Sequence, residues 1–123
     1  MKDGMDLVLD GDLPASLQEI ADVIGREGAL KLVKELGGTR VFVGRRMKPN
    51  HKLAILLGHG PALKLSQMFG GETLTVVRGA TLLRRARNRE IIKRYDSGEG
   101  VRSLARRFTL TERQIYAVLS TPQ

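Results

Sequence analysis

The sequence predicts a mainly α-helical protein with short β-strands, built as a duplicated helix-helix-strand unit followed by a three-helix domain of the helix-turn-helix type. Three observations predict it: an internal repeat, a Gly-Gly pair and β-branched stretch closing each copy, and an arginine-rich helical pattern after residue 79. We expect an acidic flexible N-terminus over residues 1–12, the duplicated region over residues 13–79 and the helix-turn-helix domain over residues 80–123.

The repeat appears when residues 20–43 are aligned with residues 53–76 without a gap, because nine of the 24 positions are then identical. The copies run over about residues 14–44 and 50–77. In each copy an apolar helical stripe ends at a glycine, and a second stripe ends at Gly-Gly, which suits a left-handed helix end and a chain reversal. Asn50 is the expected N-cap of the second copy, and Pro61 is expected at a helix start.

Each copy is expected to end in a short strand, over residues 39–43 and 72–76. One short strand cannot satisfy its own backbone, so the two strands should pair with each other or with those of a partner chain. Strand alternation places Arg40 and Phe42 on one face, with Thr73 and Thr75 on the matching face. We expect this face to be directed to solvent or a ligand.

Charge is unevenly distributed along the chain. The formal net charge is +8, but residues 1–35 carry four basic and eight acidic side chains, so the remaining residues carry +12. Residues 78–113 hold eleven basic residues, ten of them arginine, whose guanidinium groups suit bidentate contacts to phosphate and guanine. Charge alone also fits a solvated helix face or a membrane-surface helix.

Residues 82–120 show the spacing of a helix-turn-helix. A first helix ends at residues 96–100, a second covers residues 101–108, and a third covers residues 111–120 with a Thr111–Gln114 capping box. Ala105 is the small residue that a close helix crossing requires. Thr109 occupies the turn position where glycine is usual. The apolar residues expected around the crossing are Leu104, Phe108, Leu110, Ile115 and Val118.

The pattern leaves polar side chains outward on the second and third helices. Arg113 is placed to reach a guanine edge, and Arg102 and Arg106 are placed for backbone phosphates. The candidates for reading DNA bases are Thr111, Glu112, Arg113, Tyr116, Ala117 and Ser120. The candidates for contacting the DNA backbone are Arg84, Arg85, Arg87, Arg89, Arg94, Arg102, Ser103, Arg106 and Arg107.

Other classes of site find little support. His51 and His59 have no carboxylate pair at metal-ligand spacing, so no metal site is expected. The glycines match no phosphate-binding loop, and no nucleophile and base stand out, so we expect a non-enzyme without a cofactor. Cysteine is absent, and no apolar run reaches the roughly 20 residues of a membrane span. We expect a cytoplasmic, nucleoid-associated protein without a membrane partner.

The chain resembles the Mor/C family of phage transcription activators over about residues 13–120. The resemblance rests on Gly70-Gly71 with the strand that leads to Val77-Arg78-Gly79, and on residues 82–91. It also rests on residues 103–108 together with residues 111–116. The strand ends differ from the family's Tyr-Ile-Pro-like pattern, because the chain has Phe42-Val43-Gly44 and Thr75-Val76-Val77 there.

The resemblance implies a homodimer in which residues 13–79 form a helical and β-ribbon dimerisation region. It implies binding of double-stranded DNA at an imperfect dyad near a promoter, with RNA polymerase as a partner. The family's strand pair lies close to the DNA minor groove. On that basis the candidate strand-to-DNA contacts are Arg40, Phe42, Arg45, Arg46 and Thr75.

Two other functions fit the same residues. An architectural or recombination-accessory protein would use the motif to bend or bridge DNA, and its footprint would lie at element ends or recombination sites. A protein-interaction module would use the helical bundle without reading DNA, and it would fail to retard any duplex at low salt. A sequence-specific regulator, more specifically an activator, would instead protect DNA upstream of a promoter.

Overall fold

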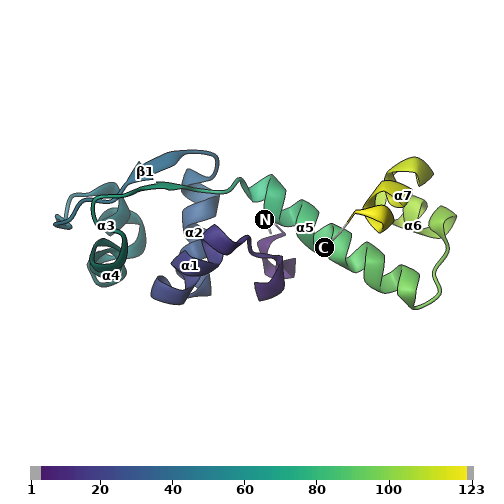
Figure 1. Cartoon of the computed structure of the whole chain (residues 1–123), viewed down its shortest axis with the longest axis horizontal. Helices are drawn as coiled ribbons and strands as arrows, with labels where there is room; N and C mark the ends of the chain where they lie inside the picture. Colours follow the sequence, from purple (N-terminus) through teal and green to yellow (C-terminus); the bar gives the residue numbers. More distant parts are fainter. Residues whose placement is uncertain (1–3, 122–123) are drawn as a thin grey trace. The chain divides into compact units, whose positions relative to one another are not determined.

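The computed structural model describes residues 4–121 of the chain (Figure 1). About 67% of the residues are helical, and one two-stranded antiparallel sheet accompanies seven α-helices within the described part. The predicted fold class, mainly α with short strands, is confirmed. The chain divides between Leu83 and Arg84 into two compact units.

The first unit contains two successive sets of helix, helix and strand. Each pair of helices is separated by a single glycine, Gly25 or Gly58, whose φ of 88° or 93° turns the chain in a way that L-residues rarely allow. The elements are α1 (Ala15–Ile24), α2 (Arg26–Leu36), β1 (Arg40–Phe42), α3 (Lys52–Leu57), α4 (His59–Phe69) and β2 (Thr73–Thr75).

The strands β1 and β2 pair with each other within the chain. Their antiparallel register places Arg40 opposite Thr75, Val41 opposite Leu74 and Phe42 opposite Thr73. Both strands are shorter than expected, yet the backbone bonding continues past their ends, where Val43 N donates to Glu72 O over 2.9 Å. Residues 40, 42, 73 and 75 are all exposed, so the expected outward face of the ribbon is confirmed.

The core of the first unit lies between the ribbon and the four helices. Under the ribbon, Val41, Val43 and Val76 are almost fully buried. Leu32 of α2 and Leu65 of α4 are equally buried. Helix α1 packs against α2 and α4, and α3 packs against α2 and α4. Each fully buried side chain of this size stabilises the fold by about 1.5–3 kcal/mol relative to an exposed one.

Of two expectations about helix starts, the one for Asn50 is wrong, and the one for Pro61 holds because Pro61 lies in the first turn of α4. The N-cap of α3 is His51 rather than Asn50, because His51 Nδ1 accepts a hydrogen bond from Leu53 N at 3.0 Å. Helix α4 begins at His59, two residues before Pro61. Pro61 is still tolerated there, since the first four N–H groups of a helix have no partner within the helix.

The segment expected to be a flexible acidic N-terminus is folded where it is described. Two short 3-10 helices, Met5–Leu7 and Asp10–Asp12, flank the fully buried Val8. Asp12 is itself buried, and its Oδ2 accepts a hydrogen bond from Leu9 N at 2.8 Å. Arg26 donates to Val8 O and lies 3.3 Å from Asp10 Oδ1. Residues 1–3 of the expected segment lie outside the described residues.

The second unit contains the C-terminal part of α5 (Gly79–Asp96), α6 (Val101–Phe108) and α7 (Glu112–Ser120). Its core consists of Ile91, Leu104, Ala105, Ile115 and Val118. Partly buried around this core are Ile92, Val101, Phe108, Leu110 and Leu119. The small side chain of Ala105 therefore lies in the contact between helices, as its position in the sequence predicts.

The capping box at the start of α7 is confirmed. Thr111 Oγ1 accepts from Gln114 N at 3.1 Å, and Thr111 N donates to Gln114 Oε1 at 2.8 Å. These two bonds satisfy the backbone N–H groups of Thr111 and Gln114, so the first turn of α7 is held in its helical conformation.

The turn between α6 and α7 contains a strained residue. Thr109 adopts φ 56° and ψ 47°, and it is the only non-glycine residue with a positive φ between residues 4 and 121. A β-branched residue in this left-handed conformation costs roughly 1–2 kcal/mol because Cβ approaches the carbonyl oxygen. The turn is held by a hydrogen bond from Leu110 N to Ala105 O at 2.9 Å.

Replacing Thr109 by asparagine should raise the free energy of unfolding of the second unit by about 1 kcal/mol, since asparagine tolerates the left-handed conformation. Urea denaturation followed by tyrosine fluorescence reports on this unit, because the only two tyrosines, Tyr95 and Tyr116, both lie in it. As a control, Gly98→Ala should lower the free energy of unfolding, because Gly98 has φ 106°, which strains the backbone of alanine. A Cβ there would meet no atom within 4 Å, so backbone strain is the only expected cause. Equal or lower stability of Thr109→Asn would contradict the left-handed turn.

Candidate nucleic-acid interface

Helix α7 has one buried face and one exposed face. Ile115 and Val118 point into the core, which fixes the rotation of the helix. All six predicted base-reading residues are exposed as a result: Thr111, Glu112, Arg113, Tyr116, Ala117 and Ser120. Arg113 is the second residue of α7, where the helix N-terminus already carries partial positive charge. The arrangement suits a negatively polarised ligand surface.

Two of these six residues also have local roles. The hydroxyl of Thr111 is committed to the capping box, and Ser120 Oγ donates to Ala117 O at 3.2 Å. The side chain of Arg113 makes no hydrogen bond or ion pair within residues 4–121, and Tyr116 is 60% exposed. The side chains available for outside contact are therefore concentrated in the first two turns of α7.

The predicted backbone-contacting residues of α6 fall into two groups. Ser103 and Arg107 lie four residues apart, and both bind the carboxylate of Glu99. Arg102 and Arg106 lie on a neighbouring face, are exposed, and make no ion pair within the described part of the chain. The same eight-residue helix thus presents one pair of side chains to the protein and another pair to solvent.

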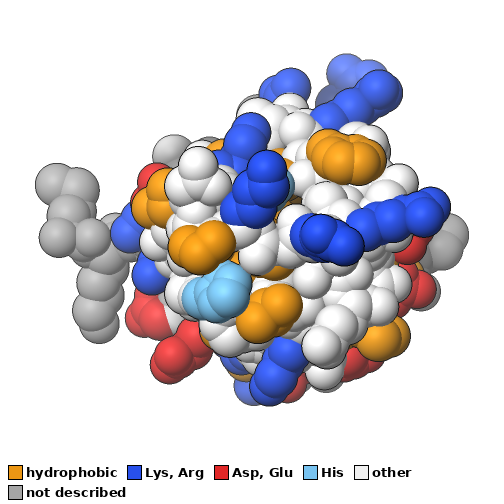
Figure 2. Space-filling model, turned by 90° about the vertical axis from the view of Figure 1, so that its left-hand side faces the viewer, with side chains coloured by type: hydrophobic (Ala, Val, Ile, Leu, Met, Phe, Trp, Pro, Cys, Tyr) orange, Lys and Arg blue, Asp and Glu red, His pale blue; other side chains and the backbone are white. Residues whose placement is uncertain are grey.

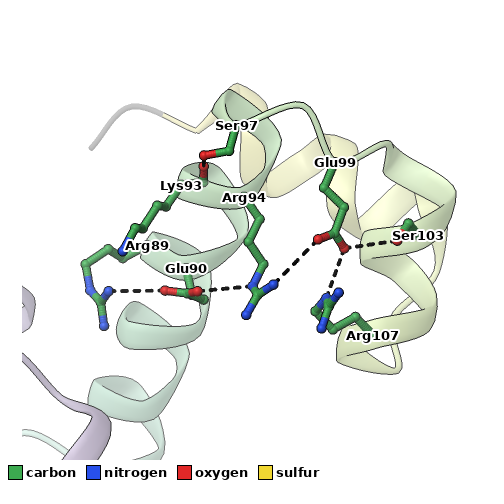
Figure 3. A network of polar contacts seen from close by, with 8 residues as sticks. All are labelled: Arg89, Glu90, Lys93, Arg94, Ser97, Glu99, Ser103 and Arg107. Atoms are coloured by element: carbon green, nitrogen blue, oxygen red, sulfur yellow. Dashed lines mark hydrogen bonds and ion pairs between the residues drawn. The ribbon is translucent and has the colours of Figure 1, made fainter.

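Glu99 is the centre of a network that joins α5 to α6 (Figure 3). Its Oε2 lies 3.0 Å from both Ser103 Oγ and Arg107 Nε, and its Oε1 lies 3.6 Å from Arg94 Nη1. The hydrogen bond from Arg107 lowers the pKa of the Glu99 carboxyl, and the bond from Ser103 and the charges of Arg107 and Arg94 act in the same direction against partial burial. Glu99 is therefore an ionised anchor.

The network continues along α5. The buried Arg94 Nε lies 3.0 Å from Glu90 Oε1, an ion pair whose alignment falls short of a hydrogen bond. Arg89 Nη1 lies 3.6 Å from the other oxygen of Glu90. Arg87 donates to Asn88 Oδ1 through both Nε and Nη2, at 3.1 and 2.9 Å. Several arginines expected on DNA thus have partners within the protein.

The other two residues of α5 that are predicted to contact the DNA backbone, Arg84 and Arg85, are both exposed. Arg84 makes no ion pair among the described residues, whereas Arg85 has a partner of its own. The nine residues predicted to contact the DNA backbone therefore fall into two groups, according to whether the side chain has a partner within the protein. Those engaged inside the protein are Arg85, Arg87, Arg89, Arg94, Ser103 and Arg107, and those without an internal partner are Arg84, Arg102 and Arg106.

The strand candidates belong to the first unit. Arg40, Phe42, Arg45, Arg46 and Thr75 are all exposed, and Phe42 is 58% exposed. Figure 2 shows the end of this unit that carries α3 and α4, where Lys, Arg, His and hydrophobic side chains occupy the middle and acidic side chains lie toward the margin. The ribbon face and the α7 face are therefore two separate basic surfaces on two different units.

Glu99 is not among the site residues predicted from the sequence, although it holds α6 to α5. Its spacing from Ser103 and Arg107, four and eight residues on, is the signal that points to it. The pair of Glu90 with Arg94 was equally accessible, because oppositely charged residues four apart on a helix are neighbours.

The two histidines have ordinary polar roles. His51 caps α3, and His59 Nε2 lies 3.3 Å from Met47 O. Among residues 4–121, no group of three or more His, Asp or Glu side chains is arranged to hold a metal ion. Within the same residues, no helix combines the length and hydrophobicity that crossing a membrane requires.

Comparison with protein families matches the chain to the Mor transcription activator family over residues 45–122. The matched span contains α3, α4 and β2 of the first unit, all of α5, and the two helices α6 and α7. No curated protein and no solved structure matches the chain. The family match covers more than half of the sequence, and the chain therefore belongs to the Mor transcription activator family.

Proposed function

We propose that the protein binds specific sites on double-stranded DNA through α7 and activates transcription of phage, prophage or mobile-element genes. The observation that carries the proposal is the exposed face of α7, whose rotation is fixed by the burial of Ile115 and Val118. A helix of this kind, crossing a second helix at a small residue, fits the major groove with its N-terminal residues toward the bases. Family membership supports the activating role, with RNA polymerase as the partner.

Within the proposed interface, different side chains contact bases, contact phosphates and position the helices. Arg113 offers paired donors that match the O6 and N7 acceptors of guanine, and Tyr116 lies one turn further along the same face. Arg102 and Arg106 have no internal partner and supply the phosphate contacts from α6. Ser103 and Arg107 hold α6 in place through Glu99. The ribbon arginines Arg40, Arg45 and Arg46 are proposed to contact phosphates from the first unit.

One chain carries one α7, so reading a dyad requires two chains. We propose that the protein acts as a homodimer on DNA, with one chain on each half-site and half-sites about one helical turn, roughly 34 Å, apart. The number of chains bound to each duplex therefore tests this arrangement directly.

Replacing Arg113 by alanine should weaken binding to the specific site by about 1–3 kcal/mol and relax preference at one base pair, because one bidentate contact is lost. Sites are first selected from random duplexes, and fluorescence anisotropy then compares a selected duplex with a scrambled one. The control is Gln114→Ala, which changes an adjacent exposed residue without a charge and affects helix capping rather than base contact. Equal losses on both duplexes for Arg113→Ala would remove its base-reading role.

Adjacent arginines on α6 provide a matched pair. Arg106→Ala should weaken specific and scrambled duplexes alike and reduce the slope of log affinity against log salt by about one unit, since one phosphate contact is lost. Arg107→Ala should leave that slope nearly unchanged and should lower the urea midpoint of the second unit, since it breaks the bond to Glu99. The assignment is reversed if Arg107→Ala flattens the salt slope and Arg106→Ala does not.

The stability effect of Arg107→Ala should depend on pH. Because the folded protein lowers the pKa of Glu99 below its usual 4.5, the stabilisation is complete above pH 4.5 and is lost as pH falls through the lower folded value. The difference in urea midpoint between the wild-type protein and Arg107→Ala should therefore shrink below pH 4.5. A difference that stays constant across this range would show that Glu99 is not the partner that matters.

A duplex with two half-sites should carry two chains, whereas a duplex with a single half-site should carry one. Light scattering of the complexes measures both masses directly. One chain on the two-site duplex at saturating protein would contradict the dyad arrangement and would leave a protein that reads one half-site alone.

A further inference from the structure

In the two halves of the first unit, residues 14–45 and residues 47–78, the second helices α2 and α4 and the strands β1 and β2 begin and end 33 residues apart. The first helices also end at equivalent positions, but α3 begins at Lys52 and is shorter than α1. Gly25 has φ 88° and ψ 161°, and Gly58 has φ 93° and ψ 155°. Gly37 and Gly70 share φ −56°, with ψ of 136° and 129°. These two segments are the first half and the second half of the unit.

The backbone hydrogen bonds between the halves are reciprocal. Gly38 N donates to Val76 O at 2.7 Å, and Gly71 N, its equivalent, donates to Val43 O at 2.7 Å. Val76 N donates to Thr39 O at 2.9 Å, and Val43 N donates to Glu72 O at 2.9 Å. Contacts that repeat in both directions are the mark of two units related by a two-fold axis, as in a symmetric dimer.

The contacts of the Gly-Gly pairs with arginine side chains are reciprocal in the same way. A Cβ on Gly71 would lie 3.0 Å from Arg45 Nε, and a Cβ on Gly38 would lie 3.1 Å from Arg78 Nε. Arg45 and Arg78 are themselves at equivalent positions, each at the end of one half. Each Gly-Gly pair thus makes room for the arginine of the other half, which explains why both copies keep it.

The outer surfaces of the halves have diverged while the interface has not. The equivalent residues Leu32 and Leu65 are both buried. The exposed Asp22 corresponds to Ile55, which is 73% exposed, and the exposed Glu35 corresponds to Met68, which is 63% exposed. The second half therefore has exposed hydrophobic side chains at two positions where the first half has carboxylates, and Figure 2 shows the end of the unit that carries α3 and α4. Two copies of one sequence cannot differ in this way, but two halves of one chain can.

The family match begins at Arg45, so it contains only the second half together with α5, α6 and α7. A chain with a single half has a three-residue strand without a partner, and a second copy must supply one. We infer that the first half is an in-chain substitute for that second copy. The ribbon surface is closed within one chain, and the free protein is a monomer with a single α7.

This inference goes beyond the proposed function, because it states where two chains do not meet. Two chains on a dyad lie side by side through their separate contacts with DNA, and the β1–β2 ribbon does not join them. Each chain then presents a single DNA-reading helix, α7, together with a first unit whose two strands pair with each other.

Cysteine cross-linking tests the inference directly, because the natural chain has no cysteine. Phe42 and Thr73 are opposite in the register, and the alternation of bonded pairs makes them a non-hydrogen-bonded pair, in which side chains lie closest. Oxidised Phe42→Cys/Thr73→Cys should give an intrachain disulfide and the mass of one chain by light scattering at every concentration. Arg40→Cys/Thr75→Cys, the other exposed cross-strand pair, should behave identically.

Mixing the two single variants Phe42→Cys and Thr73→Cys distinguishes pairing within a chain from pairing between chains. Pairing within a chain leaves only slow collisional dimers, with all three combinations of cysteines. Selective formation of the disulfide between the two different variants, or a covalent dimer as the main product of the double variant, would overturn the inference. No DNA is present, so the outcome is independent of whether the protein reads DNA through α7.

Discussion

The exchange of backbone hydrogen bonds between β1 and β2 is the interaction on which the first unit depends. Each strand has only three residues, and neither can satisfy its backbone without the other. The bonds at Gly38 and Gly71 extend the pairing beyond the strands and bring the ends of α2 and α4 to the ribbon. Val41, Val43 and Val76 then close the core beneath it. Loss of either half would expose this apolar surface as well as the strand edge.

The second unit depends on a different constraint, the close crossing of α6 and α7 at Ala105. The left-handed Thr109 forms the turn, the capping box holds the first turn of α7, and Glu99 ties α6 to Arg94 of α5. Because these contacts use one set of polar groups internally, the remaining set is left to solvent. The arginine-rich composition therefore has two physical roles: some guanidinium groups position the helices, and others remain available for an anionic partner.

Much of this arrangement could be predicted from the sequence, because it follows from periodicity and local chemistry. The apolar spacing around Ala105 gave the crossing of α6 and α7, and Thr111 with Gln114 gave the cap. The choice of His51 over Asn50 as a cap depends on side-chain geometry that two adjacent polar residues leave open. The role of Glu99 could not be predicted, because it depends on how residues 97–100 turn. The pairing of the strands could not be predicted either, because the same strand pattern permits pairing within a chain or between chains.

The central proposal is that α7 binds specific DNA near a promoter. The most direct measurement is a hydroxyl-radical footprint of the purified protein on DNA that flanks its own gene, at low and moderate salt. The account predicts a discrete protected site upstream of a promoter that persists at moderate salt. No protection at either salt concentration, or protection confined to the ends of the genetic element, would contradict it.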